Sequence, residues 1–198
     1  MNDEELASRV IIQPDSTDAG IVGLCAFYAS MNLYVLLGLE PPPLERMLDL
    51  APAVGDDGGL SVFGQMMLLS ELNFPGLVGL GVIPHGQTAR DTLPPLLDAG
   101  ARLLLGIQFT SEVNPDWAAR QGDPQLAGVP FESSHVLVGY GWSDEGVKAI
   151  VGWSYQRIAC MRWKAVPFYH WGRLPLPGVA LHREFVMVWP NLQKGGQG

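Results

Sequence analysis

The segment Cys25-Ala-Phe-Tyr-Ala-Ser-Met-Asn-Leu-Tyr-Val-Leu-Leu37 is apolar along most of its length, and Gly38 follows it. It is long enough for a helix and has apolar side chains on nearly every face, which predicts a central, buried helix. Gly38 suits the position after a helix end, and Pro41-Pro42-Pro43 cannot continue a helix. We therefore expect a helix that begins at Cys25 and lies inside a core.

The rest of the first half also favours helices. Residues 44–50 predict a short helix, and Ser61 is a candidate N-cap for an apolar segment with helical spacing. Thr92, which precedes Leu93-Pro94-Pro95, predicts another N-cap with prolines in the first turn, and Gly100 would end that helix. The first half of the chain is therefore expected to be mainly helical.

The second half favours strands. Asp144-Glu145-Gly146 is typical of a hairpin turn, and residues 110–133 predict a long polar loop. The strand-like segments are residues 103–109, 135–141, 147–153, 157–163 and 184–189. This order predicts an α+β fold in one domain, residues 1–198, with a mainly helical half (1–100) and a mainly antiparallel β half (101–198).

Composition excludes several classes of function. The 198 residues carry a formal net charge of −8, which would repel a phosphate backbone, so nucleic-acid binding is not expected. No apolar run reaches the length that a membrane-spanning helix needs, and the acidic N-terminus does not resemble a signal peptide. Two cysteines, Cys25 and Cys160, make no disulfide framework and match no zinc pattern. We expect a cytoplasmic protein without membrane contact, metal or cofactor.

Cys25 is the candidate nucleophile. A cysteine at a helix N-terminus has a lowered pKa because the helix dipole and free N–H groups favour the thiolate. Gly23, just before it, would let a substrate approach the backbone. A lone cysteine in an apolar segment is more often a core residue, so this position alone does not establish catalysis.

His135 is the candidate base, because it begins an apolar strand beside the long polar loop. A titratable group at such a place suits the wall of a cleft. The other histidines have no comparable setting: His85 lies in a Pro-His-Gly turn, and His170 and His182 lie in segments rich in proline and tryptophan.

Four segments, in order, resemble the papain-like (C1) cysteine peptidases. Residues 18–27, Asp-Ala-Gly-Ile-Val-Gly-Leu-Cys-Ala-Phe, resemble the nucleophile segment, and Gly55-Asp-Asp-Gly-Gly-Leu-Ser61 resembles the family's glycine pair followed by a helix. Ser134-His-Val-Leu-Val-Gly-Tyr-Gly141 resembles the catalytic-histidine strand, and residues 147–154 resemble the strand after it. The resemblance covers residues 18–154 and implies a papain-like fold with a cleft between the two halves.

The resemblance also implies roles for individual residues. Cys25 would attack the substrate and His135 would transfer the proton. Gly58 and Gly59 would hydrogen-bond an extended substrate backbone, and Leu60 would line an apolar specificity pocket. A peptide or protein is the expected substrate or binding partner.

Two helper positions of the family are altered. The family's oxyanion-binding glutamine, six residues before the cysteine, is here Ala19. The asparagine that orients the imidazole, sixteen residues after the histidine, is here Val151. If the register slips, Gly152 or Ser154 takes that place, and of these two only Ser154 has a side chain that hydrogen-bonds. A further departure is Ala26, where the family has tryptophan.

Substitutes for the lost helpers lie nearby in sequence. Gln13, Asp15 and Thr17 are candidates for the oxyanion hole, and Asp144 would orient His135 if the hairpin folded back. Loss of one oxyanion donor costs about 10²–10³ in rate, and an unoriented imidazole costs up to about 10⁴ by analogy with the serine triad. These magnitudes predict a slow or narrow activity at best.

Two kinds of function follow as hypotheses. The first is a peptidase or amidase that uses a Cys25–His135 dyad, and transfer to an amine would use the same dyad. The second is a catalytically inactive papain-fold protein that serves as a binding or structural subunit of a larger assembly, a virion being one option.

Overall fold

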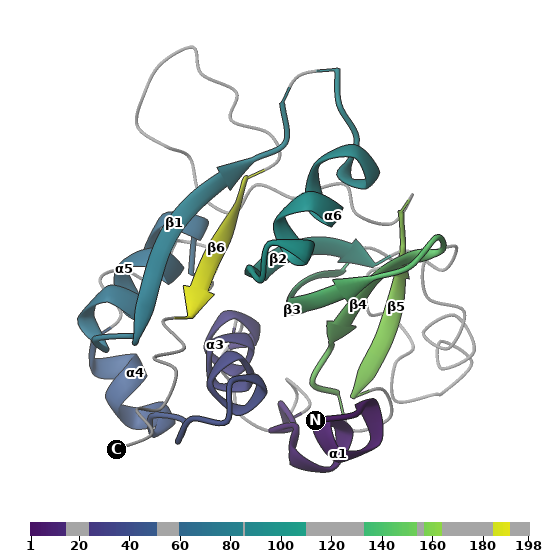
Figure 1. Ribbon diagram of the computed structural model, residues 1–198. Helices are drawn as coiled ribbons and strands as arrows, with labels where there is room; N and C mark the ends of the chain where they lie inside the picture. Colours follow the sequence, from purple (N-terminus) through teal and green to yellow (C-terminus); the bar gives the residue numbers. More distant parts are fainter. Residues whose placement is uncertain are drawn as a thin grey trace, which may run out of the picture.

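The computed structural model describes residues 1–14, 24–50, 60–84, 86–109, 133–153, 157–163 and 184–190. Within these residues, five helices pack against a six-stranded antiparallel open sheet, which confirms the α+β class (Figure 1). The helices are α1 (Asp3–Arg9), α3 (Cys25–Leu36), α4 (Leu44–Leu50), α5 (Val62–Glu71) and α6 (Ala89–Asp98). The strands are β1 (Gly76–Val82), β2 (Arg102–Phe109), β3 (Ser133–Trp142), β4 (Gly146–Ile150), β5 (Ile158–Arg162) and β6 (Glu184–Pro190). The strand order across the sheet is β1-β6-β2-β3-β4-β5.

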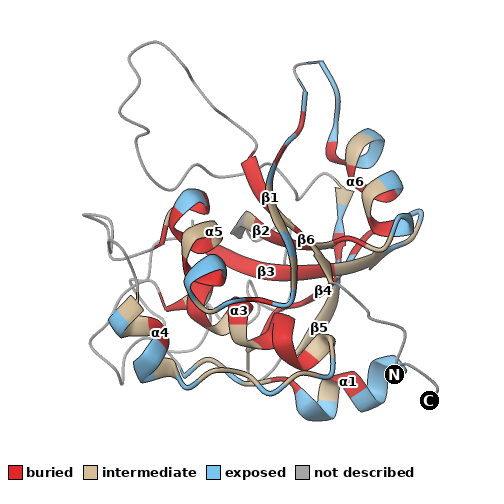
Figure 2. Ribbon diagram, turned by 60° about the vertical axis from the view of Figure 1, so that its left-hand side comes forward, coloured by how far each residue is buried: buried red, intermediate tan, exposed pale blue. Residues whose placement is uncertain are grey.

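The two faces of the sheet are buried against different helices. Because side chains alternate along a strand, Val136 and Val138 of β3 face a core shared with α1, α3, α4 and α5. Leu137, between them, faces a second core shared with α6. Figure 2 shows that buried residues dominate both β3 and α3. The sheet is therefore a middle layer, with α3 on one side and α6 on the other.

Helix α3 has the bounds that its sequence predicts. It begins at Cys25 and ends at Leu36, and Gly38 has a φ of +70°, the left-handed conformation expected after a helix end. Residues from all around the helix are buried, in agreement with its apolar composition. The predicted central helix is confirmed.

Two other helices agree with the sequence and one differs at its start. Helix α4 matches residues 44–50, and Ser61 caps α5 by accepting a hydrogen bond from the Gly64 N–H at 3.0 Å. The predicted N-cap at Thr92 is wrong, because α6 is capped by Thr88. Thr88 and Asp91 form a reciprocal capping box, which satisfies free donors at the helix start and outweighs the two prolines farther along.

The strands follow the predicted segments, with one addition. Strands β2, β3, β5 and β6 match closely, whereas β4 ends at Ile150, before the predicted Trp153. Residues 143–146 close the predicted hairpin, with mutual backbone hydrogen bonds between Ser143 and Gly146. The sequence analysis missed β1, whose glycine-rich segment pairs with β6 from the far end of the chain. Apart from Ser133, the predicted loop 110–133 lies outside the described residues.

The pairing of β3 and β4 determines where the candidate site lies. These strands pair from Val138 to Trp142, opposite Ile150 to Val147. β3 begins five residues earlier, and after Ile150 the chain turns away through residues 151–153. The start of β3 thus has β2 on one side and, among the described residues, no strand on the other. Helix α3 packs against β3.

Candidate active site

Cys25 is the first residue of α3, as predicted. The N-cap residue, Leu24, makes no side-chain hydrogen bond to the helix start. The backbone N–H groups of Cys25 and Ala26 instead act to lower the pKa of the Cys25 thiol. The residue as a whole is half-buried. The start of the helix therefore favours the thiolate.

Cys25 also lies near the strand that carries the candidate base. The backbone N–H of Val136, the residue after His135, is among the groups that lower the pKa of the Cys25 thiol. Val136 lies where β3 has no described partner strand on the β4 side. The start of α3 therefore lies near the start of β3, in agreement with the packing of α3 on β3.

The ionisation of Cys25 differs from the sequence-based expectation. Burial raises the pKa of the thiol above its ordinary value, although the three backbone N–H groups, of Val136, Ala26 and Cys25, act to lower it. Placement at a helix start is not enough to make a thiolate here, because the loss of water around the sulfur outweighs the donors. The expected low pKa is therefore corrected: Cys25 is a neutral thiol near pH 7.

His135 is buried, with 3% of its surface exposed, and its ring is held by the main chain. Its Nε2 lies 2.8 Å from the carbonyl oxygen of Val151. A carbonyl oxygen only accepts hydrogen bonds, so Nε2 must carry the hydrogen. In the neutral ring Nδ1 is then the nitrogen that carries no hydrogen, as a general base requires.

The surroundings of His135 keep it neutral. Its ring centroid lies 4.7 Å from that of Trp153, with the planes tilted by 36°. Burial lowers the pKa of His135 to about 4, and the Val151 carbonyl opposes this by favouring the protonated form. Near pH 7 the site therefore holds a neutral imidazole as well as a neutral thiol.

A tight turn fixes the carbonyl that holds the ring. Gly152 has a φ of +81°, which glycine adopts at little cost. The N–H groups of Val151 and Gly152 both donate to the Arg157 carbonyl, at 2.8 and 3.3 Å. The peptide group between Val151 and Gly152 thus has both ends bound, one to Arg157 and one to His135.

Position 151 therefore supplies an acceptor that its side chain lacks. A valine side chain cannot accept a hydrogen bond, so Val151 indicated from sequence that the group that orients the His135 ring was lost. The positive φ of the next residue turns the backbone carbonyl toward the ring instead. The signal that could have revealed this is Gly152 itself, since a glycine at this point permits the turn.

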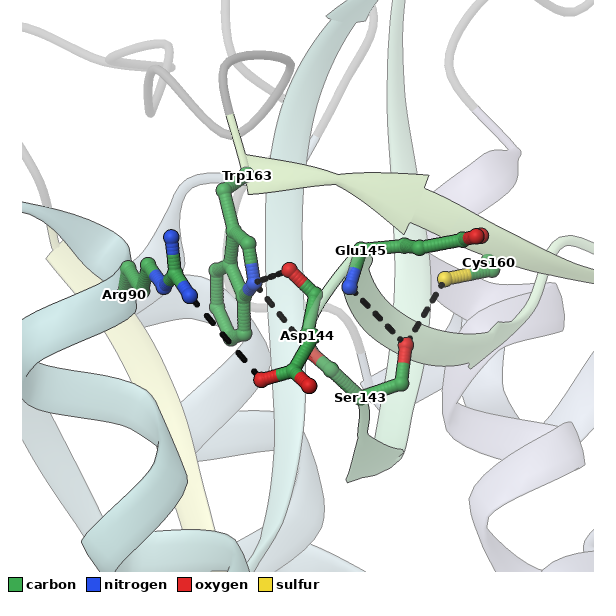
Figure 3. A network of polar contacts seen from close by, with 6 residues as sticks. All are labelled: Arg90, Ser143, Asp144, Glu145, Cys160 and Trp163. Atoms are coloured by element: carbon green, nitrogen blue, oxygen red, sulfur yellow. Dashed lines mark hydrogen bonds and ion pairs between the residues drawn. The ribbon is translucent and has the colours of Figure 1, made fainter.

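Other proposed helpers lie elsewhere. Asp144 is 95% exposed and lies 3.9 Å from Arg90, in the polar network around Cys160 that Figure 3 shows. The Gln13 backbone donates to Gly152, and Leu60 is buried in the core on the α3 side, with 1% of its surface exposed. The remaining residues considered from sequence lie outside the described part of the chain: Asp15, Thr17, Ala19, Gly23, Gly58, Gly59, His85, Ser154, His170 and His182.

Two surface cavities lie away from the thiol. One, of about 460 Å³, is lined by residues of α5 and β1 and of the turn that joins them. The other, of about 570 Å³, is lined by residues at the end of α6 and on β2, β3 and β4. Neither is lined by Cys25 or His135, so neither defines a substrate site for this pair.

In the described part of the chain, no group of three or more histidine, cysteine, aspartate or glutamate side chains is arranged to hold a metal ion. Among the same residues, no helix combines the length and the apolar character needed to span a bilayer.

Comparison with known proteins adds no relative. The chain matches no model of a known protein family and no curated protein sequence.

Proposed function

We propose that this protein is a papain-like thiol hydrolase that acts on a peptide or amide, with Cys25 as nucleophile and His135 as general base. One observation carries the proposal. Cys25 lies close enough to the start of β3 for the Val136 N–H, next to His135, to lower the thiol pKa, and the His135 ring is held by a carbonyl sixteen residues farther along, the position of the family's ring-orienting asparagine.

The reaction would start from the neutral pair. As the sulfur attacks the substrate carbonyl carbon, the thiol proton passes to Nδ1 of His135 and the carbonyl electron pair moves to its oxygen. The N–H of Cys25 would stabilise that oxyanion. The imidazolium then gives the proton to the leaving amine, which leaves a thioester. Water hydrolyses the thioester with His135 again accepting the proton, so thiol and imidazole are regenerated.

The neutral pair supports a slow activity. A thiol with a raised pKa must lose its proton during the attack, since no preformed thiolate is available. The imidazole with a lowered pKa is a weaker base than an ordinary histidine, although it stays unprotonated from about pH 5 upward. We therefore expect catalysis that depends on substrate binding to complete the site, through the predicted contacts of Gly23, Gly58 and Gly59. Leu60 is buried in the core and is not proposed as a substrate contact.

The test compares three purified proteins. Wild type, Cys25→Ala and Cys160→Ala are incubated with a peptide pool at pH 8, and new termini are identified by mass spectrometry. Wild type and Cys160→Ala should give the same products, and Cys25→Ala should give none. Cleavage that persists in Cys25→Ala contradicts the proposal, and so does a complete lack of products in all three.

A non-catalytic role is the second candidate, and the raised thiol pKa favours it. In this case the papain-like architecture would serve as a binding or structural subunit of a larger assembly. A stable complex that forms equally with wild type and Cys25→Ala, without any cleavage product, would support this role. A product that requires Cys25 would rule it out.

A further inference from the structure

The segment after α1 connects the nucleophile helix to the turn that holds His135. Asn32 of α3 is buried, with 2% of its surface exposed, and its side-chain amide hydrogen-bonds both the N–H and the carbonyl of Ile11. The Ile11 N–H donates to Oδ1 at 2.8 Å, and Nδ2 donates to the Ile11 carbonyl at 2.9 Å. A buried amide with both its groups used is a fixed connection, because its loss would leave polar atoms unpaired.

The same segment then reaches the turn. Two residues after Ile11, the Gln13 N–H donates to the Gly152 carbonyl at 2.8 Å. A methyl group placed on Gly152 would lie 3.3 Å from the Asn32 amide nitrogen and 3.6 Å from the Ile11 carbonyl. Gly152 is therefore packed against Asn32 as well as hydrogen-bonded to Gln13.

These bonds hold the two peptide groups that flank Gly152. The first carries the Val151 carbonyl toward His135, and its N–H makes a bond of 3.3 Å to Arg157. The second carries the Gly152 carbonyl, whose bond to Gln13 is shorter at 2.8 Å. Because a rotation at Gly152 would disturb both groups, the Gln13 bond restrains the direction of the Val151 carbonyl.

Cys25 and Asn32 are seven residues apart on one helix, so their side chains lie near the same face two turns apart. Cys25 places its sulfur near the start of β3. Asn32, through Ile11 and Gln13, holds the turn behind His135. One helix thus carries the thiol and, through Asn32, holds the segment that binds the turn behind His135.

We propose that Asn32 and the strap formed by residues 10–13 are positioning residues for His135: they keep the Val151 carbonyl on Nε2 and so keep Nδ1 as the nitrogen without a hydrogen. The consequence for catalysis rests on the proposed function, whereas the orientation of the ring does not. The strap thus makes the base depend on the helix that carries the nucleophile.

The decisive variant removes one hydrogen bond. Gln13→Pro deletes the N–H that binds Gly152, and Gln13→Ala keeps that N–H while it removes the side chain. The ring nitrogens of His135 are observed by ¹⁵N NMR, with folding checked by circular dichroism. Wild type and Gln13→Ala should show a single neutral form protonated at Nε2. Gln13→Pro should show an average of the two neutral forms, and its His135 pKa should move upward from about 4.

Activity supplies the second readout. If the enzyme hydrolyses a substrate, kcat should fall about 10²-fold in Gln13→Pro with KM unchanged, because a displaced base affects the chemical step and not binding. Gln13→Ala, which keeps the N–H, should lose less of kcat than Gln13→Pro. Unchanged ring signals and unchanged kcat in folded Gln13→Pro would overturn the proposal.

The outcomes separate the two proposals. Ring signals that change in Gln13→Pro while wild type shows no hydrolysis would support the strap and refute the enzyme. If wild type hydrolyses a substrate and Gln13→Pro shows the same ring signals and kcat, the result would support the enzyme and refute the strap. If Gln13→Pro does not fold, Asn32→Ser takes its place with the same measurements, since serine is too short to bind both groups of Ile11.

Discussion

The two halves of the candidate site differ in what holds them. On the α3 side, the position of Cys25 follows from a local pattern: an apolar segment, a cysteine at its start and a glycine after its end. On the β side, His135 is oriented by a carbonyl from the turn after β4, which is fixed by Arg157 and by Gln13. The comparison shows that the position of α3 is set by residues close to it in sequence. The orientation of the His135 ring instead depends on backbone groups that other segments of the chain supply.

The largest expected effect is the dependence of stability on His135 protonation. Its pKa is about 4 in the folded protein and about 6.5 in the unfolded chain, so the unfolded chain binds more protons between these values. Stability is therefore highest above about pH 6.5 and is lost as the pH falls through this window, by about 3 kcal/mol. Urea unfolding of wild type and His135→Phe at pH 7 and pH 4.5 would measure it. An equal pH dependence in both proteins would contradict the buried, neutral ring.

The next effect compares two glycines with similar backbone angles. Gly38 (φ +70°) has open space around it, whereas Gly152 (φ +81°) lies against Asn32. Gly38→Ala should cost about 1 kcal/mol through backbone strain alone. Gly152→Ala should cost about 2 kcal/mol, because the added methyl also presses on the buried amide. Thermal or urea unfolding measures both values. Equal losses of unfolding free energy would mean that the turn at Gly152 accommodates the added methyl without disturbing Asn32.

A smaller effect separates the two cysteines. Cys160 is exposed on β5, and Cys25 is partly exposed with a raised pKa. In the absence of substrate, Cys160 should react with iodoacetamide about tenfold faster than Cys25 at pH 7. Cys25→Ser and Cys160→Ser each isolate one thiol for mass spectrometry. Faster labelling of Cys25 would show that the donors at the start of α3 outweigh its burial.

The smallest effect concerns the helix whose start the sequence analysis misplaced. Thr88→Ala should cost about 1 kcal/mol, because it removes the capping bonds to Asp91. Thr92→Ala, which lies one turn inside α6, is the matched control and should change stability by less. Equal losses in urea unfolding would mean that Thr88 is not the effective cap.

How far the sequence could predict this structure depends on the range of the interactions. Helix α3, the cap at Ser61 and the turn near Asp144 were predictable because their signals lie within a few residues. Thr88 was missed because two prolines at 94–95 resembled a first turn, while the capping box six residues earlier was overlooked. Strand β1 was missed because its glycines weaken the strand pattern and its partner, β6, is remote in sequence.

The candidate site was predictable in part for the same reason. Cys25 and His135 were selected from local patterns, and the structure packs the helix that begins at Cys25 against the strand that carries His135. The role of position 151 was not predictable from its valine, because a backbone carbonyl carries no residue identity. The ionisation of Cys25 also required the fold, since burial depends on residues that pack around the helix start.

The position of β6 has a consequence for how the chain acquires its structure. This strand lies between β1 and β2, although residues 184–190 follow all the other described strands in sequence. Until they have been synthesised, β1 lacks the strand with which it pairs, and β3 is the one neighbour of β2 among the described strands. Pairing strands that are far apart in sequence reduces chain entropy before the stabilising contacts form. We therefore expect slow folding that finishes only after β6 has left the ribosome.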